Sequence, residues 1–122
     1  MIKFREANFD DVNTYFIWVN DPLVRSISFN TNTVTLSEHK KWFINKIKDK
    51  NSLMLLFEIS NKPIGQVRFE KEDDNHSVIN ISISSEFRGN GYGSQILKIL
   101  LEPNSQFFHL RVAIIIYSFT LD

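Results

Sequence analysis

The stretch Arg88-Gly89-Asn90-Gly91-Tyr92-Gly93 holds three of the four glycines in the chain. Before it, residues 77–84 alternate isoleucine with asparagine or serine, a period of two that predicts a β-strand with one buried face. After it, residues 92–102 repeat isoleucine and leucine on one helical face, which predicts an α-helix that Pro103 ends. The stretch is therefore predicted to be a loop between a strand and a helix.

A loop of this kind can hold a phosphate group. Glycines let the backbone turn sharply and bring its N–H groups close to a ligand, and the first turn of a helix carries unpaired N–H groups and partial positive charge. Arg88 adds a cation at the edge. Two phosphate motifs do not fit: a P-loop needs a lysine after the last glycine, where Ser94 stands, and the dinucleotide fingerprint needs a third glycine at that position. A plain flexible turn is the alternative interpretation.

The rest of the chain divides into strands and helices by the same periodicities. In chain order we predict a strand at residues 2–7, helices at 10–19 and 36–48, strands at 53–59, 64–70 and 77–84, the helix at 92–102 and a strand at 110–121. Residues 23–34 are polar and predicted to be irregular. Three consecutive strands with short connections favour an antiparallel meander, and the final strand–helix–strand unit favours a parallel right-handed pair. The predicted fold class is α/β (α+β), a mixed sheet with helices on both faces.

The composition is that of one ordinary globular domain spanning residues 1–122, with 43% hydrophobic and 23% charged residues. The absence of cysteine excludes disulfides, zinc ribbons and thiol nucleophiles, and no paired histidine spacing suggests a metal site. Fourteen basic residues balance fourteen acidic ones, so we expect neither nucleic acid nor a membrane as partner. No apolar run approaches the ~20 residues of a membrane span, and no signal peptide is recognisable, so a cytoplasmic location is expected.

The loop also resembles a known pattern, namely Arg or Gln, two residues, Gly, one residue, then Gly or Ala, which Arg88, Gly91 and Gly93 match. This is similar to the acetyl-CoA pyrophosphate loop of the GCN5-related N-acetyltransferase (GNAT) superfamily. Residues 18–25 (WVNDPLVR) resemble the branch of ribosomal-protein and sugar-nucleotide N-acetyltransferases, and residues 63–69 (PIGQVRF) resemble amino-sugar acetyltransferases. The resemblance implies an enzyme that transfers acetyl from acetyl-CoA to a primary amine, most closely an amino-sugar nucleotide.

The resemblance also implies which residues hold the coenzyme. Backbone amides of the loop would take the pyrophosphate, and the end of the preceding strand would hydrogen-bond the pantetheine arm. A backbone N–H near Ile83 would polarise the thioester carbonyl. The coenzyme-binding residues predicted in this way are Ile83, Ser84, Arg88, Gly89, Asn90, Gly91, Tyr92, Gly93 and Ser94.

On the acceptor side, the resemblance implies that Trp18, Asn20 and Arg25 contact the substrate. The base that removes a proton from the attacking ammonium has two catalytic candidates, His39 and Glu70, of which His39 has the better intrinsic pKa. Structural roles stay open for these side chains: the tryptophan in the core, the asparagine at the end of a helix, the arginine in a surface ion pair and the histidine as a structural or solvated group.

The chain departs from the superfamily after its last predicted strand. The superfamily usually adds a further helix, whose tyrosine protonates the leaving thiolate, and a final β-hairpin, whereas this sequence ends at Asp122. We therefore expect a single GNAT-like domain without that helix and hairpin, and a homodimer formed through the uncovered apolar strand Val112–Tyr117. Two alternatives stay open: a non-catalytic acyl-CoA-binding or assembly module, and acetylation of a protein N-terminus as in the ribosomal-protein branch.

Overall fold

A five-stranded mixed sheet forms the centre of the protein, in the order β1-β2-β3-β4-β5. The computed structural model describes residues 1–28, 30–74 and 76–102, and the backbone of residues 114–120. In chain order the elements are β1 (Ile2–Glu6), a 3-10 helix η1 (Phe9–Asp11), α1 (Val12–Val19), α2 (Pro22–Ser26), α3 (Leu36–Lys48), β2 (Ser52–Ile59), β3 (Lys62–Lys71), β4 (Ser77–Ile83), a 3-10 helix η2 (Ser85–Phe87), α4 (Tyr92–Leu101) and β5 (Ile114–Thr120).

The pairing of the strands confirms the predicted fold class. The first four strands form an antiparallel meander, and β4 pairs with β5 in parallel. The strand predicted at residues 110–121 is described only from Ile114 to Thr120. Its other residues, like the Pro103 that was expected to end the preceding helix, lie outside the described residues.

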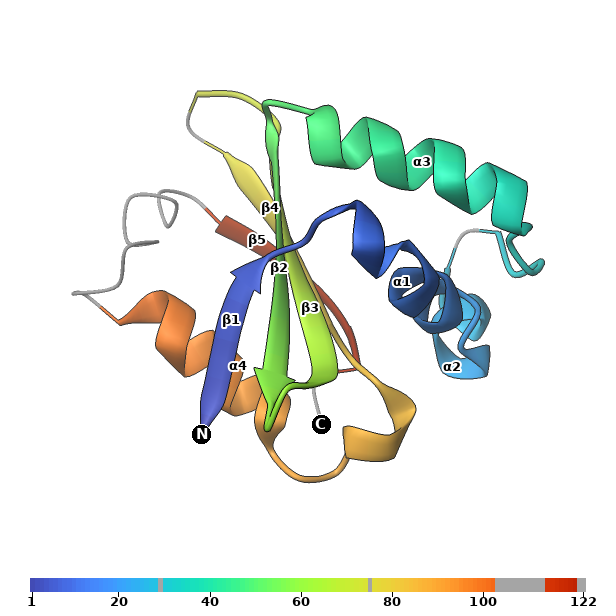
Figure 1. Cartoon of the computed structure of the whole chain (residues 1–122). Coiled ribbons are helices and arrows are strands. Elements are labelled where there is room, and N and C mark those ends of the chain that lie inside the picture. The colour runs from blue at the N-terminus through green and yellow to red at the C-terminus, as the bar shows by residue number, and fades with distance from the viewer. Residues whose placement is uncertain (29, 75, 103–113, 121–122) are drawn as a thin grey trace.

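The sheet separates two layers of helices, with α4 on one face and α1, α2 and α3 on the other (Figure 1). Ile96 and Leu100 of α4 are buried against the isoleucines of β4. On the opposite face, Tyr15 of α1 and Phe43 of α3 pack against β2 in a second cluster. Because successive side chains of a strand point to opposite faces, each strand can serve both layers.

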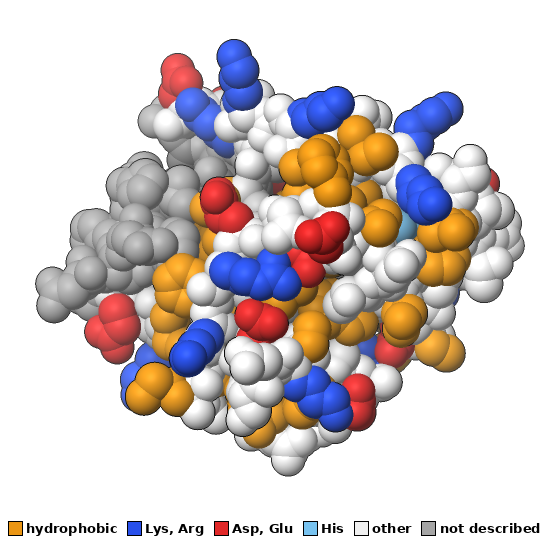
Figure 2. All heavy atoms as spheres, in the orientation of Figure 1, with side chains coloured by type: hydrophobic (Ala, Val, Ile, Leu, Met, Phe, Trp, Pro, Cys, Tyr) orange, Lys and Arg blue, Asp and Glu red, His pale blue; other side chains and the backbone are white. Residues whose placement is uncertain are grey.

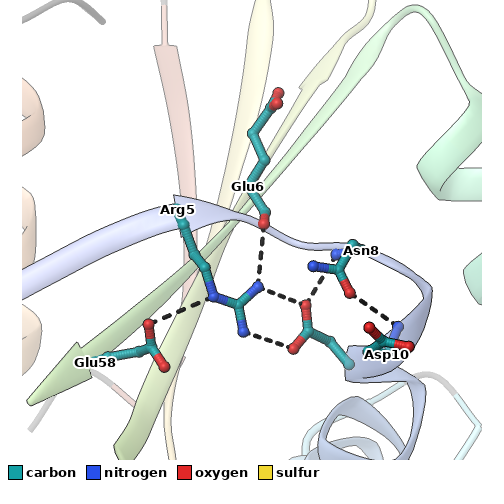
Figure 3. Close-up of polar contacts among 6 residues, drawn as sticks. Arg5, Glu6, Asn8, Asp10 and Glu58 are labelled. Carbon is teal, nitrogen blue, oxygen red and sulfur yellow. Dashed lines mark hydrogen bonds and ion pairs between the residues drawn. The ribbon is translucent and has the colours of Figure 1, made fainter. Parts of the chain in front are cut away.

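Figure 3 shows the contacts that fix where α1 begins. Arg5 of β1 donates from both terminal nitrogens to the carboxylate of Asp11, at 2.8 Å each, and its Nε lies 3.4 Å from Glu58 of β2. The backbone N–H of Asn8 also donates to Asp11. Burial raises the pKa of Asp11, but the hydrogen bonds from Arg5 and Asn8 outweigh burial and lower that pKa overall. The Arg5–Asp11 ion pair therefore ties the start of α1 to the sheet.

The segment after α1 contains a short helix where the sequence predicts irregular structure. Residues Pro22–Ser26 form α2, whose first turn is capped by Asp21 accepting the N–H of Leu23 at 2.9 Å. Proline at the first helical position is favoured because its missing N–H would have no partner there. The prediction for residues 23–26 is therefore wrong, because the Asp-Pro pair that ends one helix also starts the next.

Strands β3 and β4 approach each other closely at Gly65. A Cβ at this position would lie 2.6 Å from the backbone oxygen of Ser82 and 3.3 Å from the Cα of Ile83. Real Cβ contacts are longer, so a side chain would force the two strands apart. The glycine thus brings β3 against the end of β4 that leads into the glycine-rich loop.

Candidate active site

The loop between β4 and α4 is open to solvent at its two left-handed glycines. Gly89 and Gly91 have φ angles of 80° and 77°, and among the described residues no heavy atom beyond the chain neighbours lies within 4 Å of either Cβ position. Gly91 is the N-cap of α4 and has no side chain with which to cap the helix. The loop therefore offers an uncovered backbone at the positive end of α4, which is the arrangement that favours an anion.

Two neighbouring side chains stabilise the loop from within. Asn90 donates from Nδ2 to the backbone oxygens of Phe87 and Arg88, at 3.1 and 3.3 Å. The ring of Tyr92 meets that of Phe87 edge-on at 6.2 Å, and Gly93 is buried in the first turn of α4. The predicted coenzyme residues Asn90, Tyr92 and Gly93 therefore belong to one local unit around the start of α4.

Arg88 points inward from the loop instead of standing free as a cation. Its Nε donates to the backbone oxygen of Ile83 at 2.9 Å. Its two terminal nitrogens face the two carboxylate oxygens of Asp21, at 3.2 and 3.1 Å. The side chains of Arg88 and Asp21 are only 18% and 12% exposed, so this Arg88–Asp21 ion pair is largely shielded from water.

The end of β4 lies directly before the loop. Ile83 is opposite Gly65, and the N–H of Ser84 donates to Ile64 at 2.8 Å. The last pair between β4 and β5 in the described residues joins Ser82 to Thr120. The side-chain oxygen of Ser84 is buried without a hydrogen-bond partner in the described part of the chain. The predicted coenzyme residues Ile83 and Ser84 thus lie at the end of β4 that leads into the glycine-rich loop.

A cavity of about 440 Å³ opens between the sheet and the layer of α1, α2 and α3. Side chains from all three helices and from β3 and β4 surround it. The lining residues are Tyr15, Trp18, Val19, Val24, Arg25, Ser28, Val34, Glu38, His39, Trp42, Gln66, Arg68, Asn80 and Ser82. The cavity therefore shares strand β4 with the glycine-rich loop, and it contains three of the predicted acceptor-side residues, namely Trp18, Arg25 and His39.

The floor of the cavity is polar but uncharged over β4. Gln66 donates from Nε2 to Asn80 at 2.9 Å and to Ser82 at 3.1 Å. Its own oxygen is buried without a partner in the described residues, as is the hydroxyl of Tyr15. Burial raises the pKa of Tyr15, so its hydroxyl is neutral at physiological pH. Two buried oxygens thus have hydrogen-bonding capacity left for a molecule in the cavity.

Two of the predicted substrate residues hold the segment that follows α2. Asn20 lies outside the cavity lining, and its amide pairs with both backbone groups of Val34, at 2.9 and 2.7 Å. Arg25 lines the cavity, but its guanidinium donates to backbone oxygens of Val19 at 2.7 Å and Asn30 at 2.9 Å. These contacts give both side chains a structural role in shaping the cavity wall.

His39 lies in the cavity wall and is 2% exposed. Its Nε2 is 3.0 Å from the backbone oxygen of Val12, and its ring contacts those of Phe16 and Trp42. Burial lowers the pKa of His39, and the hydrogen bond to Val12 offsets part of this. Because a carbonyl can only accept, Nε2 carries the hydrogen in the neutral ring and Nδ1 is left as the acceptor.

Glu70, the other candidate base, lies outside the cavity lining. Its carboxylate is 2.8 Å from Lys46 and 2.7 Å from Arg68, and the guanidinium of Arg68 stacks over Trp42 at 5.1 Å. Burial raises the pKa of Glu70, but Lys46 and Arg68 outweigh it and lower that pKa overall. A carboxylate stabilised in this way accepts a proton poorly near neutral pH.

Sequence reasoning missed three residues that the structure brings to the site. Tyr15 and Gln66 line the cavity, and Asp21 contacts the loop through Arg88. Tyr15 falls within the helix predicted at residues 10–19 and Asp21 follows its end, so the sequence by itself indicates a structural role for both. Gln66 lies within residues 63–69, whose resemblance to amino-sugar acetyltransferases is the signal that could have pointed toward the cavity.

Charged side chains of both signs are interspersed over the molecular face in Figure 2, and lysines follow the edge where α3 lies. Within the described ranges, no three His, Cys, Asp or Glu side chains gather as a metal site would require. Among those same residues, no helix has the length and apolarity needed to cross a membrane.

A family model described as an acetyltransferase (GNAT) domain matches residues 2–118 of the chain. No curated protein sequence matches the chain, but solved structures match it. A spermidine N-acetyltransferase from Vibrio cholerae, in complex with CoA and spermine, superposes with a TM-score of 0.73 at 18% identity, over 84% of this chain and 62% of that one.

Two further solved structures show the same fold. An N-acetyltransferase from Staphylococcus aureus Mu50 gives a TM-score of 0.67 at 21% identity, over 83% of this chain and 64% of that one. A ribosomal-protein-alanine N-acetyltransferase from Brucella melitensis gives a TM-score of 0.73 at 21% identity, over 93% of this chain and 72% of that one. The chain thus spans less than two thirds of the Vibrio and Staphylococcus proteins.

Proposed function

Because this chain belongs to the acetyltransferase (GNAT) domain family, we propose that it transfers an acetyl group from acetyl-CoA to a primary amine. The observation that carries the proposal is the open glycine loop at the start of α4, beside a cavity that shares strand β4. One feature would hold the coenzyme and the other the amine. The two reactants would then meet at the end of β4.

The loop fits a coenzyme A diphosphate. With Gly89 and Gly91 in the left-handed region and nothing over their Cβ positions, a ligand can approach the backbone of residues 89–94 closely. The diphosphate would lie on the amides at the start of α4, and the pantetheine arm would follow Ile83 and Ser84 at the end of β4. When bound, acetyl-CoA supplies an activated thioester carbonyl.

The cavity suits an amino sugar better than a polyamine. Its walls include Trp18 and Trp42, whose faces pack well against the C–H surface of a ring, and its floor presents neutral amide and hydroxyl groups. Glu38 is the only carboxylate among the described lining residues, against two arginines. A polycation would need several carboxylates to replace its water. We assign the acceptor to the amino-sugar class, carried on a nucleotide as the sequence resemblance implies.

We assign the base to His39. Its lowered pKa keeps the ring neutral at physiological pH, and Nδ1 is its acceptor atom because Nε2 donates to Val12. A proton leaving the acceptor's ammonium would move to Nδ1, which leaves the nitrogen lone pair free to attack. Glu70 is the weaker candidate, since its carboxylate is held by Lys46 and Arg68 outside the cavity.

The experiment that tests the coenzyme site is calorimetric titration of the chain with acetyl-CoA. Gly91→Val should abolish measurable binding, because a β-branched residue is strained at φ 77° and its side chain would stand where the diphosphate approaches. The matched control is Asn61→Val in the β2–β3 turn, which also has a left-handed φ of 64° but lies outside the loop. Unchanged affinity in G91V, or equal loss in N61V, would contradict the assignment.

Release of free thiol identifies the acceptor. The chain is mixed with acetyl-CoA and, in separate reactions, a nucleotide-linked amino sugar, spermidine or a peptide with N-terminal alanine. Thiol release with the amino sugar alone supports the proposal. Thiol release with spermidine or the peptide would overturn the proposed acceptor class, but the proposal that the chain is an acetyltransferase would stand. Binding of acetyl-CoA with no release from any amine would instead support the non-catalytic acyl-CoA-binding module.

A further inference from the structure

We propose that the Arg88–Asp21 ion pair couples the coenzyme loop to the wall of the acceptor cavity, which makes Asp21 a positioning residue for coenzyme binding. The inference rests on the proposed function, because it takes the loop to be the coenzyme A site. The two residues are 67 positions apart in the sequence. Their contact is a direct side-chain link between the loop that precedes α4 and the helices on the opposite face of the sheet.

The contact fixes the orientation of the Arg88 guanidinium as well as its distance from Asp21. Each terminal nitrogen of Arg88 faces its own carboxylate oxygen of Asp21, at 3.2 and 3.1 Å. Paired contacts of this kind hold the planar guanidinium in one orientation, which a single ammonium cannot do. Since both side chains are mostly shielded from water, solvent screens the pair less than it would at the surface.

Asp21 also determines where α2 begins. Its Oδ1 accepts the N–H of Leu23 at 2.9 Å, and the helix that follows carries Val24 and Arg25 into the cavity wall. A helix of five residues is too short to persist without tertiary contacts. The carboxylate that starts α2 is therefore also the group through which Arg88 holds that helix.

Arg88 connects three parts of the site at once. Its Nε holds the backbone oxygen of Ile83 at the end of β4, its terminal nitrogens hold Asp21, and its own backbone leads directly into Gly89, the first left-handed residue of the loop. Without Asp21 the guanidinium loses its second anchor, and the loop amides are less well arranged before the ligand arrives. Loss of such preorganisation weakens binding without removing any contact to the ligand.

A positioning role for Arg88 and a direct phosphate-binding role predict different effects of replacing it by lysine. A cation that acts on the diphosphate only through its charge could be replaced by lysine with little loss of affinity, because lysine also binds phosphate as a point charge. A positioning arginine could not, because lysine cannot hold Ile83 and both oxygens of Asp21 together. The substitution Arg88→Lys keeps the charge and removes the geometry, so it separates the two roles.

The test is calorimetric titration with coenzyme A of the wild-type chain and of four variants, D21N, R88K, the double variant D21N/R88K and D11N. Asparagine caps helices as well as aspartate does, so D21N preserves the start of α2 and removes the carboxylate. We expect D21N and R88K each to raise Kd about tenfold, and the double variant to add little more, because both remove one interaction. D11N, the matched control, disrupts the Arg5–Asp11 pair of Figure 3 and should lower the melting temperature with Kd unchanged.

A second measurement follows the link itself. Hydrogen exchange of the amides in Leu23–Ser26 should be faster in R88K than in wild type, and unchanged in D11N. Wild-type affinity in D21N or R88K, or unchanged exchange in α2, would overturn the coupling. If the wild-type chain does not bind coenzyme A, the proposed function fails; if it binds and D21N binds equally well, only the coupling fails.

Discussion

At the scale of single residues, the cavity combines side chains that serve the fold with side chains that have hydrogen-bonding capacity left over. Asn20 donates to the backbone of Val34, and Arg25 donates to backbone oxygens at the end of α1 and in the segment after α2. The oxygen of Gln66 and the hydroxyl of Tyr15 are buried without partners in the described residues. His39 does both, since Nε2 is committed to Val12 while Nδ1 is the remaining acceptor.

The lowered pKa of His39 makes stability depend on pH. A histidine whose pKa falls below its ordinary 6.5 on folding favours the neutral form in the folded state. Its contribution is complete above about pH 6.5 and is lost as the pH falls through the folded pKa. We expect the free energy of unfolding in urea to fall as the pH decreases below about 6.5, and His39→Gln to flatten that fall. A variant with the wild-type slope would contradict the prediction; His76→Gln, at an exposed turn, controls for the loss of one histidine.

The positions of these residues were partly predictable from sequence, but their partners were not. The resemblance of residues 18–25 to an acetyltransferase branch placed Trp18 and Arg25 on the acceptor side, and both line the cavity. The backbone oxygens that hold Arg25 belong to Val19 at the end of α1 and to Asn30 after α2, so they depend on how the chain folds around α2. No local pattern encodes such contacts, because they are set by tertiary packing.

At the scale of secondary structure elements, periodicity predicted most of what the structure contains. The alternation of residues 77–84 matches β4, in which Ile79, Ile81 and Ile83 are buried. The short helix α2 was missed because a proline after an acidic residue signals the end of one helix and the start of another equally well. A hydrophobic period after the proline would indicate that a second helix begins there. A helix of five residues has too few turns to show such a period.

The contact of β3 with β4 at Gly65 leads to a prediction about stability. Gly65→Ala would place a Cβ 2.6 Å from the backbone oxygen of Ser82, and a backbone atom in a paired strand cannot move aside alone. We expect a loss of about 1–3 kcal/mol in the free energy of unfolding, as for other overpacked sites, measured as a lower urea midpoint. A G65A protein as stable as wild type would show that β3 and β4 part there without cost.

At the scale of the whole molecule, the site exists only once distant segments have come together. The cavity takes side chains from α1, α2, α3, β3 and β4, and the Arg88–Asp21 ion pair spans 67 positions. The sequence predicted the loop because all its residues are contiguous. It predicted the cavity only through resemblance, since five separated elements leave no contiguous signature.

The sheet also bears on self-association. In the described residues β5 pairs with β4 alone and ends the strand order, and an edge strand of this kind can pair with another chain. The homodimer expected from the C-terminal strand stays a prediction, which light scattering after size-exclusion chromatography can test. A mass twice that of one chain would support the dimer, and the mass of a single chain at high concentration would refute it.

The two-sided nature of β4 has a consequence for how this protein can change over generations. Asn80 and Ser82 face the cavity, whereas Ile79 and Ile81, which alternate with them along the strand, belong to the core under α4. Point substitutions at the first pair can therefore retune which molecule is accepted while the folded state is preserved. An insertion or deletion of one residue would move the cavity-facing side chains to the core face and the core side chains to the cavity face. Related proteins should therefore differ in the residue types of this strand and not in its length.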